Sequence, residues 1–151
     1  MALKVSELCD GIEATLATAA GIASSTSFDE LTEGIAVFDC PRLEVHPDNG
    51  TCDPSGGTDR STFGAGMQQT VVVIIAGVYA SKRSQLHDDM KVTIDMVDAI
   101  SDVLQAQEKP PFFGIAANKL KACSWSWRRR TFRRSKAFYM GARFTISCKI
   151  Y

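Results

Sequence analysis

Positive charge is concentrated on one aromatic-rich stretch of the chain. Residues 123–144 read CSWSWRRRTFRRSKAFYMGARF, with six arginines, one lysine and no acidic residue. Guanidinium groups bind phosphate or carboxylate oxygens, and interleaved aromatic rings can stack on nucleic-acid bases. The rings that could do so are Trp125, Trp127, Phe132 and Tyr139. Three roles are open: nucleic-acid binding through residues 121–143, contact with another subunit, or solvated charge.

The spacing of the tryptophans favours a packing role for them. Trp125 and Trp127 are two positions apart, so a strand places both on one face, where we expect them to pack under a helix. Arg128 and Arg130 then point the other way, and Arg133 and Arg134 are expected in the turn that follows. No recognition helix, RNP-type motif or zinc finger accompanies the arginines. Subunit contact is therefore the preferred role.

The charges of the whole chain are divided between its two parts. Residues 1–108 carry all 17 acidic residues and six basic ones, whereas residues 109–151 carry 11 basic residues and no acid. Oppositely charged surfaces can meet within one fold, or between two copies that associate head to tail. The subunit interface predicted from this division consists of Asp95, Asp98, Asp102, Arg128, Arg129, Arg130, Arg133 and Arg134.

The motifs of common catalytic and cofactor sites do not occur in the sequence. It contains no GxSxG, P-loop, GxGxxG or HExxH pattern, and the window 48–59 lacks the ligands of a calcium loop. His46 and His87 are interpreted as surface residues, and the five cysteines as small buried residues in a reducing compartment. No apolar run is long enough to span a bilayer. We therefore expect no enzyme, metal, cofactor or membrane contact.

Hydrophobic periodicity predicts an α+β fold in a single domain, residues 1–151. Helices are expected near 3–20 and 87–107, with strands near 34–47, 62–80, 120–130 and 135–151. The order α-β-β-α-β-β predicts a two-layer sandwich, in which helices cover one face of an antiparallel sheet of about four strands. Pro41 is expected at a bulge, because the apolar alternation changes phase there.

Turn-forming residues between the first two predicted strands indicate a long mobile hairpin. Residues 47–61 read PDNGTCDPSGGTDRS, and the start of the returning strand is polar and glycine-rich. We expect this hairpin to project beyond the sheet as an arm. Its charged residues are Asp48, Asp53, Asp59 and Arg60.

The buried positions follow from the same periodicities. The first helix is expected to bury Val5, Leu8, Cys9, Ile12, Leu16 and Ala19. The second is expected to bury Met90, Ile94, Val97, Ile100 and Leu104. The last strand is expected to bury Ala142, Phe144, Ile146, Cys148 and Ile150.

The order of these segments resembles the tail terminator, or tail-completion, proteins of long-tailed bacteriophages. The matching parts are ELCDGIEATLATAAG, the pair GIAVFDCPRLEVHP and TVVVIIAGVYA, the helix DDMKVTIDMVDAISDVLQAQ, and the closing strands LKACSWSWRRR and FYMGARFTISCKIY. The resemblance covers nearly the whole chain and is one of architecture, since the family has no signature motif.

The resemblance implies a structural virion protein. It implies a homo-hexameric ring, assembled in the host cytoplasm, that caps the tail tube and joins it to the head connector. DNA would pass through the lumen without sequence recognition. Two other phage roles fit the same pattern: a head-completion or stopper protein of the neck, and a tail-tube subunit. The alternative of a different class is a small nucleic-acid-binding protein that uses residues 121–143.

Overall fold

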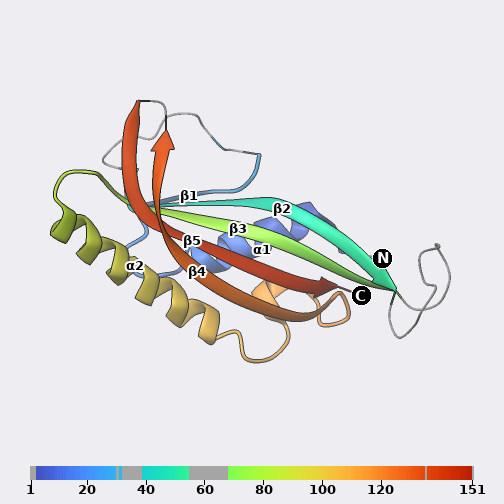
Figure 1. Cartoon of the computed structure of the whole chain (residues 1–151). Coiled ribbons are helices and arrows are strands. Elements are labelled where there is room, and N and C mark those ends of the chain that lie inside the picture. The colour runs from blue at the N-terminus through green and yellow to red at the C-terminus, as the bar shows by residue number, and fades with distance from the viewer. Residues whose placement is uncertain (1–2, 30, 32–38, 55–67, 135, 151) are drawn as a thin grey trace.

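Two helices cover one face of a five-stranded sheet (Figure 1). The computed structural model describes residues 3–29, 31, 39–54, 68–134 and 136–150. The predicted α+β architecture, with helices on one face of the sheet, is confirmed. In chain order the elements are α1 (Val5–Leu16), β1 (Ser24–Thr26), β2 (Arg42–Pro54), β3 (Gln68–Lys82), α2 (Leu86–Gln105), the 3-10 turn η2 (Phe112–Gly114), β4 (Leu120–Arg134) and β5 (Ala137–Ile150).

The strands lie side by side in the order β1-β2-β3-β5-β4. β1 pairs with β2 in parallel, and every other neighbouring pair is antiparallel. The sheet has one more strand than predicted. The extra strand is β1, which pairs only with Arg42–Glu44 of β2 and was interpreted as a Ser/Thr-rich turn. Three short polar residues carry no alternation from which a strand could be recognised.

The core lies between the sheet and the two helices. The predicted alternation of the last strand is confirmed, because all five of its expected inward residues are buried. The apolar stripes of the helices are partly wrong. Val5 and Ile94 are exposed at 42% and 40%, and Met90 is half-buried. In α2 the predicted burial of Val97, Ile100 and Leu104 is confirmed, and Asp89, Thr93 and Met96 are buried as well.

The first hairpin differs from the prediction along its length. Pro41 precedes β2, and the bulge lies between Pro47 and Asn49. Residues 47–54 were expected to be loop, but they continue the strand, and Pro54 pairs with Gln68. Turn-forming residues are tolerated there because β1 covers only the beginning of β2. The expected strand at 34–38 and the rest of the expected arm, residues 55–67, lie outside the described residues.

The sheet curls strongly at the end where β4 joins β5 (Figure 1). A bulge between Tyr79 and Ser81 interrupts the pairing of β3 with β5. At this point Gly141 packs directly on β3, where a Cβ atom would lie 1.7 Å from the Val78 carbonyl oxygen. Only glycine allows such a close approach. The bend brings the end of the hairpin over the face of the sheet that carries no helix, here called the open face.

Candidate assembly surface and basic sheet face

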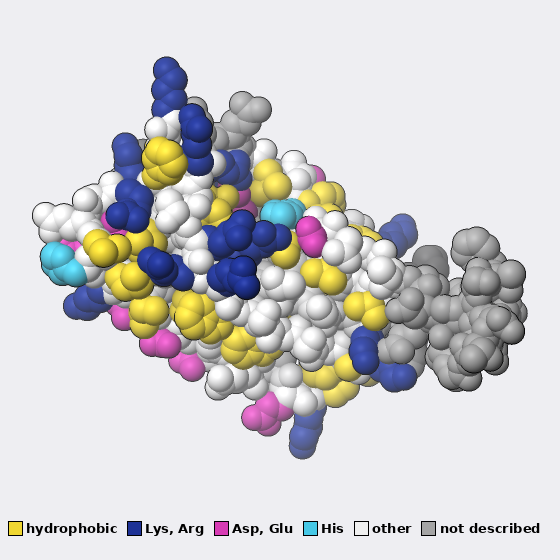
Figure 2. Space-filling view, viewed as in Figure 1, with side chains coloured by type: hydrophobic (Ala, Val, Ile, Leu, Met, Phe, Trp, Pro, Cys, Tyr) yellow, Lys and Arg dark blue, Asp and Glu magenta, His cyan; other side chains and the backbone are white. Residues whose placement is uncertain are grey.

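The three aspartates predicted at an interface form an exposed row on α2. Asp95, Asp98 and Asp102 are spaced three and four positions apart, so they lie on one side of the helix. All three are exposed, as predicted. Among the described residues none of the three makes an ion pair. Here they are called the acidic row, and Figure 2 shows acidic side chains along this edge of the molecule.

Strand β4 divides the predicted arginines between two faces of the sheet. Arg128 lies directly opposite Arg143 of β5, and Arg130 lies opposite Gly141, both on the open face. Arg129 and Arg133 point to the other side, as the alternation predicted for Arg128–Arg130 requires. The placement of the last arginines in a turn is wrong, because β4 continues through Arg134.

Arg134 is held by contacts within its own chain. Its guanidinium group donates to the Glu44 carboxylate and, at 3.2 Å, to the Tyr79 hydroxyl. Glu44 is buried, and its other oxygen accepts a hydrogen bond from Arg42 at 3.2 Å. A buried carboxylate needs such partners, because an unpaired charge in the interior is costly. Arg134 therefore stabilises the fold, and we do not retain it in the proposed interface.

The aromatic residues next to Arg134 are also engaged inside the fold. The Tyr79 ring lies 4.5 Å from the Phe132 ring and 6.0 Å from the Tyr139 ring, between centroids. Burial raises the pKa of both tyrosines. Phe132 and Tyr139, which were candidates for stacking on bases, thus pack against Tyr79.

The two tryptophans have different surroundings. Trp125 is half-buried against the core, with its ring 6.2 Å from the Phe144 ring. Trp127 is 44% exposed, so the prediction that both tryptophans are packed is wrong for Trp127. Figure 2 shows hydrophobic side chains gathered along the boundary between α2 and the β4–β5 hairpin. Trp127 of β4 and Ile94 of α2 are exposed large apolar residues of these elements.

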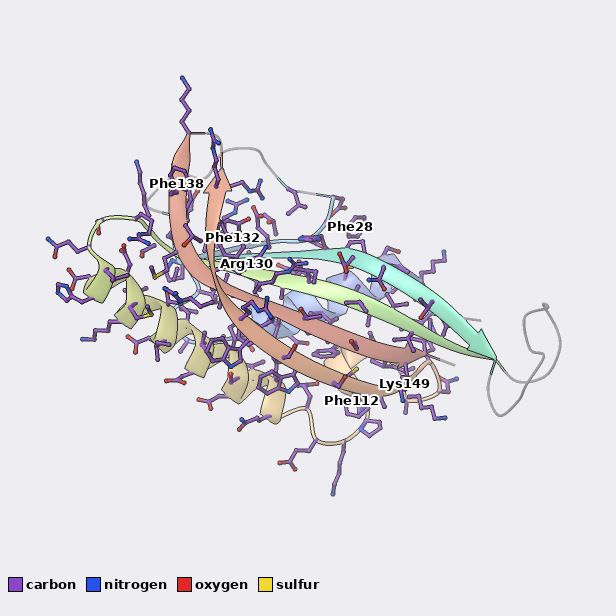
Figure 3. All side chains as sticks on the ribbon, in the orientation of Figure 1. Phe28, Phe112, Arg130, Phe132, Phe138 and Lys149 are labelled. Atoms are coloured by element: carbon purple, nitrogen blue, oxygen red, sulfur yellow. The ribbon has the colours of Figure 1, made fainter. Side chains whose placement is uncertain are left out.

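A hollow of about 330 Å³ opens on the open face of β4 and β5. It is lined by Ser126, Trp127, Arg128, Arg130, Arg143 and Thr145. Arg143 was not among the predicted site residues, because its strand was recognised from inward-facing positions. Figure 3 labels Arg130 close to Phe132 on this surface, and basic side chains gather there in Figure 2.

A larger hollow of about 560 Å³ lies at the start of α2, beside the buried Asp89. Burial alone would raise the pKa of Asp89. Hydrogen bonds from the Ser84 amide at 2.9 Å and the Ser81 hydroxyl at 3.0 Å outweigh burial, and the nearby Arg83 guanidinium adds to them. The net effect lowers the pKa of Asp89 below its ordinary value. Its hydrogen bonds fasten the beginning of α2 to the end of β3, which is a structural role.

Two thiols meet across the β4–β5 ladder. Cys123 lies opposite Cys148, with their Sγ atoms 3.3 Å apart. The hydrogen bond between the two thiols lowers the pKa of Cys123, whereas the same contact and burial raise the pKa of Cys148. Burial also raises the pKa of Cys9 to about 11. These cysteines are free thiols; the side chain of Cys52 is not described.

The remaining predicted residues are placed only in part. Asp48 is exposed on β2, and Asp53 lies in the same strand without a described side chain. Asp59 and Arg60 lie outside the described residues. His87 is exposed beside Asp88, 3.0 Å away. Within the described part of the chain, no three histidine, cysteine, aspartate or glutamate residues are grouped as metal ligands, and no helix is long and apolar enough to cross a membrane.

Comparison with known proteins adds no relative. Neither a scan against models of protein families nor a search of curated proteins finds a match for the chain.

Proposed function

We propose that the chain is a structural virion protein of a long-tailed phage, a tail terminator. In this role it assembles into a ring that caps the tail tube and joins it to the head connector. The architectural resemblance supports the identity. The observation that carries the assembly is the separation of exposed charge, with the acidic row on α2 and exposed arginines on the edge strand β4.

Separate charged surfaces suit a head-to-tail contact. In a ring each subunit presents two different surfaces, one to each neighbour. The acidic row would meet the arginines on the helix side of β4, Arg129 and Arg133. Exposed Trp127 and Ile94 would supply apolar area, and tryptophan and arginine are frequent at the energetic centres of interfaces. The charges would then select the partner surface and its register.

The sheet also offers two different edges for main-chain pairing. Among the described strands, none pairs with the outer side of β4. β1 covers β2 only at Arg42–Glu44, so the described part of β2 beyond Glu44 also has an unpaired edge. A strand edge can pair with the edge of a neighbouring chain. The described edge of β2 beyond Glu44 in one subunit would therefore pair with β4 of the next subunit.

Electron microscopy of the purified full chain tests this proposal. A terminator is expected to form closed rings of about six copies and to stop there. If the chain forms long tubes instead, its role is that of a tail-tube subunit and not of a terminator. A head-completion or stopper protein would also form rings, and binding of purified rings to the end of a tail tube separates these two roles. Particles the size of a single chain would contradict the proposal that the chain forms a ring.

A further inference from the structure

Two arginines face each other across strands β4 and β5. Arg128 and Arg143 are direct cross-strand neighbours on the open face, and like charges in this position destabilise a sheet. Arg130 follows two positions after Arg128 on the same face, about 7 Å along the strand. Among the described residues none of the three arginines makes an ion pair. An anion placed among them would remove the repulsion.

The surroundings of these arginines form a receptive hollow. All three line the same depression of about 330 Å³. Ser126 and Thr145, which are also cross-strand neighbours, line it as well and can add hydroxyl donors. The described lining includes no acidic side chain. Three guanidinium groups and two hydroxyls therefore belong to residues that line one depression.

The donor set fits phosphate better than carboxylate. One carboxylate takes one bidentate guanidinium and carries one charge, whereas successive phosphates of a nucleic-acid strand supply several charges and many acceptor oxygens. We propose that Arg128, Arg130 and Arg143 form a site for the phosphate groups of a nucleic-acid backbone on the open face of β4 and β5.

The proposed site contacts the phosphate backbone of the nucleic acid and does not recognise its bases. Phe132, the next residue along this face, packs against Tyr79. Trp127 points its side chain to the opposite side of the sheet from Arg128. Arginines whose neighbouring rings are packed or point to the other face of the sheet bind through phosphate neutralisation, which is independent of sequence and falls steeply with salt.

This site is independent of the ring. It uses the open face, whereas the proposed subunit contact uses the acidic row and the helix side of β4. A chain that stays monomeric could still bind nucleic acid here, and a ring could form without doing so. The two proposals therefore fail separately.

Fluorescence anisotropy with the full chain tests the site. The probe is a labelled single-stranded DNA 20-mer of mixed sequence, titrated at several salt concentrations, with a second sequence of the same length for comparison. Arg128→Gln and Arg130→Gln each remove one exposed guanidinium from the hollow. Lys121→Gln is the matched control, since it makes the same charge change on the same strand, about 23 Å from Arg128. Thermal unfolding and native mass are recorded for each variant.

Binding that weakens with salt is the expected result. Each arginine variant should weaken binding by about tenfold and reduce the salt slope by about one, whereas the control should match the parent chain. Both DNA sequences should bind alike. Absence of binding at low salt, or equal weakening by the control, would overturn the proposal.

Two competitors distinguish other anions from nucleic acid. Pyrophosphate should displace the probe only at far higher phosphate concentration than unlabelled DNA. If pyrophosphate competes equally, the site takes small phosphate compounds, and the assignment to nucleic acid is overturned. If polyglutamate displaces the probe better than DNA does, the surface binds an acidic protein, which also overturns the assignment.

Discussion

Arg134 of β4 contacts Glu44 of β2 although two strands, β3 and β5, lie between their strands in the sheet. In a flat sheet, strands three places apart are separated by about 14 Å. The pairing through Gly77 and Arg143 would also place Glu44 level with Arg128, so Arg134 would lie about 20 Å further along β4. The contact therefore requires the curl at the end of the β4–β5 hairpin. The bulge after Tyr79 and the close approach of Gly141 to Val78 produce this curl.

Removal of Glu44 should strongly destabilise the protein. Glu44→Ala leaves Arg42 and Arg134 without their shared carboxylate, and breaking a buried ion pair in this way costs about 3–5 kcal/mol of unfolding free energy. Denaturant unfolding measures the loss. Glu7→Ala is the control, because Glu7 makes only exposed contacts, an ion pair with Lys119 at 3.8 Å and a hydrogen bond from the Lys4 amide at 3.3 Å. Their loss should cost about 1 kcal/mol. Equal losses would show that the buried contact is not important for stability.

Gly141 should not tolerate a side chain. Gly141→Ala would place Cβ 1.7 Å from the Val78 carbonyl oxygen, so β3 and β5 must separate, at a cost of more than about 3 kcal/mol. Gly50→Ala in β2 is the matched change, since its Cβ would lie 3.7 Å from the nearest atom. Thermal unfolding of both variants compares them. A Gly141→Ala protein as stable as the Gly50→Ala protein would contradict the close packing of the two strands.

Asp89 should make the stability of the fold depend on pH in the acidic range. Its pKa is lowered in the folded chain, so its charge contributes stability above the unfolded pKa of about 3.9. That contribution is lost as pH falls from this value through the lower folded pKa. Asp89→Asn should reduce stability at pH 7 and flatten this part of the profile. Denaturant midpoints between pH 7 and pH 2.5 provide the measurement, and identical slopes for both proteins would refute the assignment.

The acidic row should control assembly. Asp98→Lys with Asp102→Lys places like charges against Arg129 and Arg133 of the neighbour, so rings should not form. A second chain carrying Arg129→Glu with Arg133→Glu should not form rings by itself, for the same reason. Mixing the two chains restores opposite charges at every contact, and mixed rings should form. Size-exclusion chromatography measures each case.

The exposed Asp29 provides the control for charge reversal. It lies outside the acidic row, so Asp29→Lys should leave assembly unchanged. Rings that form unchanged from the Asp98→Lys, Asp102→Lys chain would eliminate this pairing of surfaces. Failure of the mixture to assemble would mean that the two surfaces do not meet each other.

Features set by local periodicity were predictable from the sequence. The alternation of β5 predicted which of its residues are buried. The two-residue spacing in β4 predicted that Arg128 and Arg130 lie on the other face of the sheet from Trp127. The shifted stripe of α2 was not predictable, because burial of Asp89 depends on Ser81 and Ser84 hydroxyls that only the fold brings to it.

Contacts between strands that are distant in the chain could not be predicted from the sequence. Nothing local to Arg134 distinguishes it from Arg133, yet Arg134 reaches a carboxylate 90 positions away. The hollow was missed for a similar reason. Arg143 is isolated in its own strand, and only the register of β4 with β5 places it opposite Arg128. β1 escaped recognition because its pairing with Arg42–Glu44 depends on tertiary structure.

The native mass of the purified chain, with and without a short DNA duplex at low salt, tests the central claim most directly. The account predicts a closed assembly of about six copies whose copy number does not change when DNA is added. A monomer at all concentrations, a two-fold dimer, or a mass that grows without limit would contradict the ring.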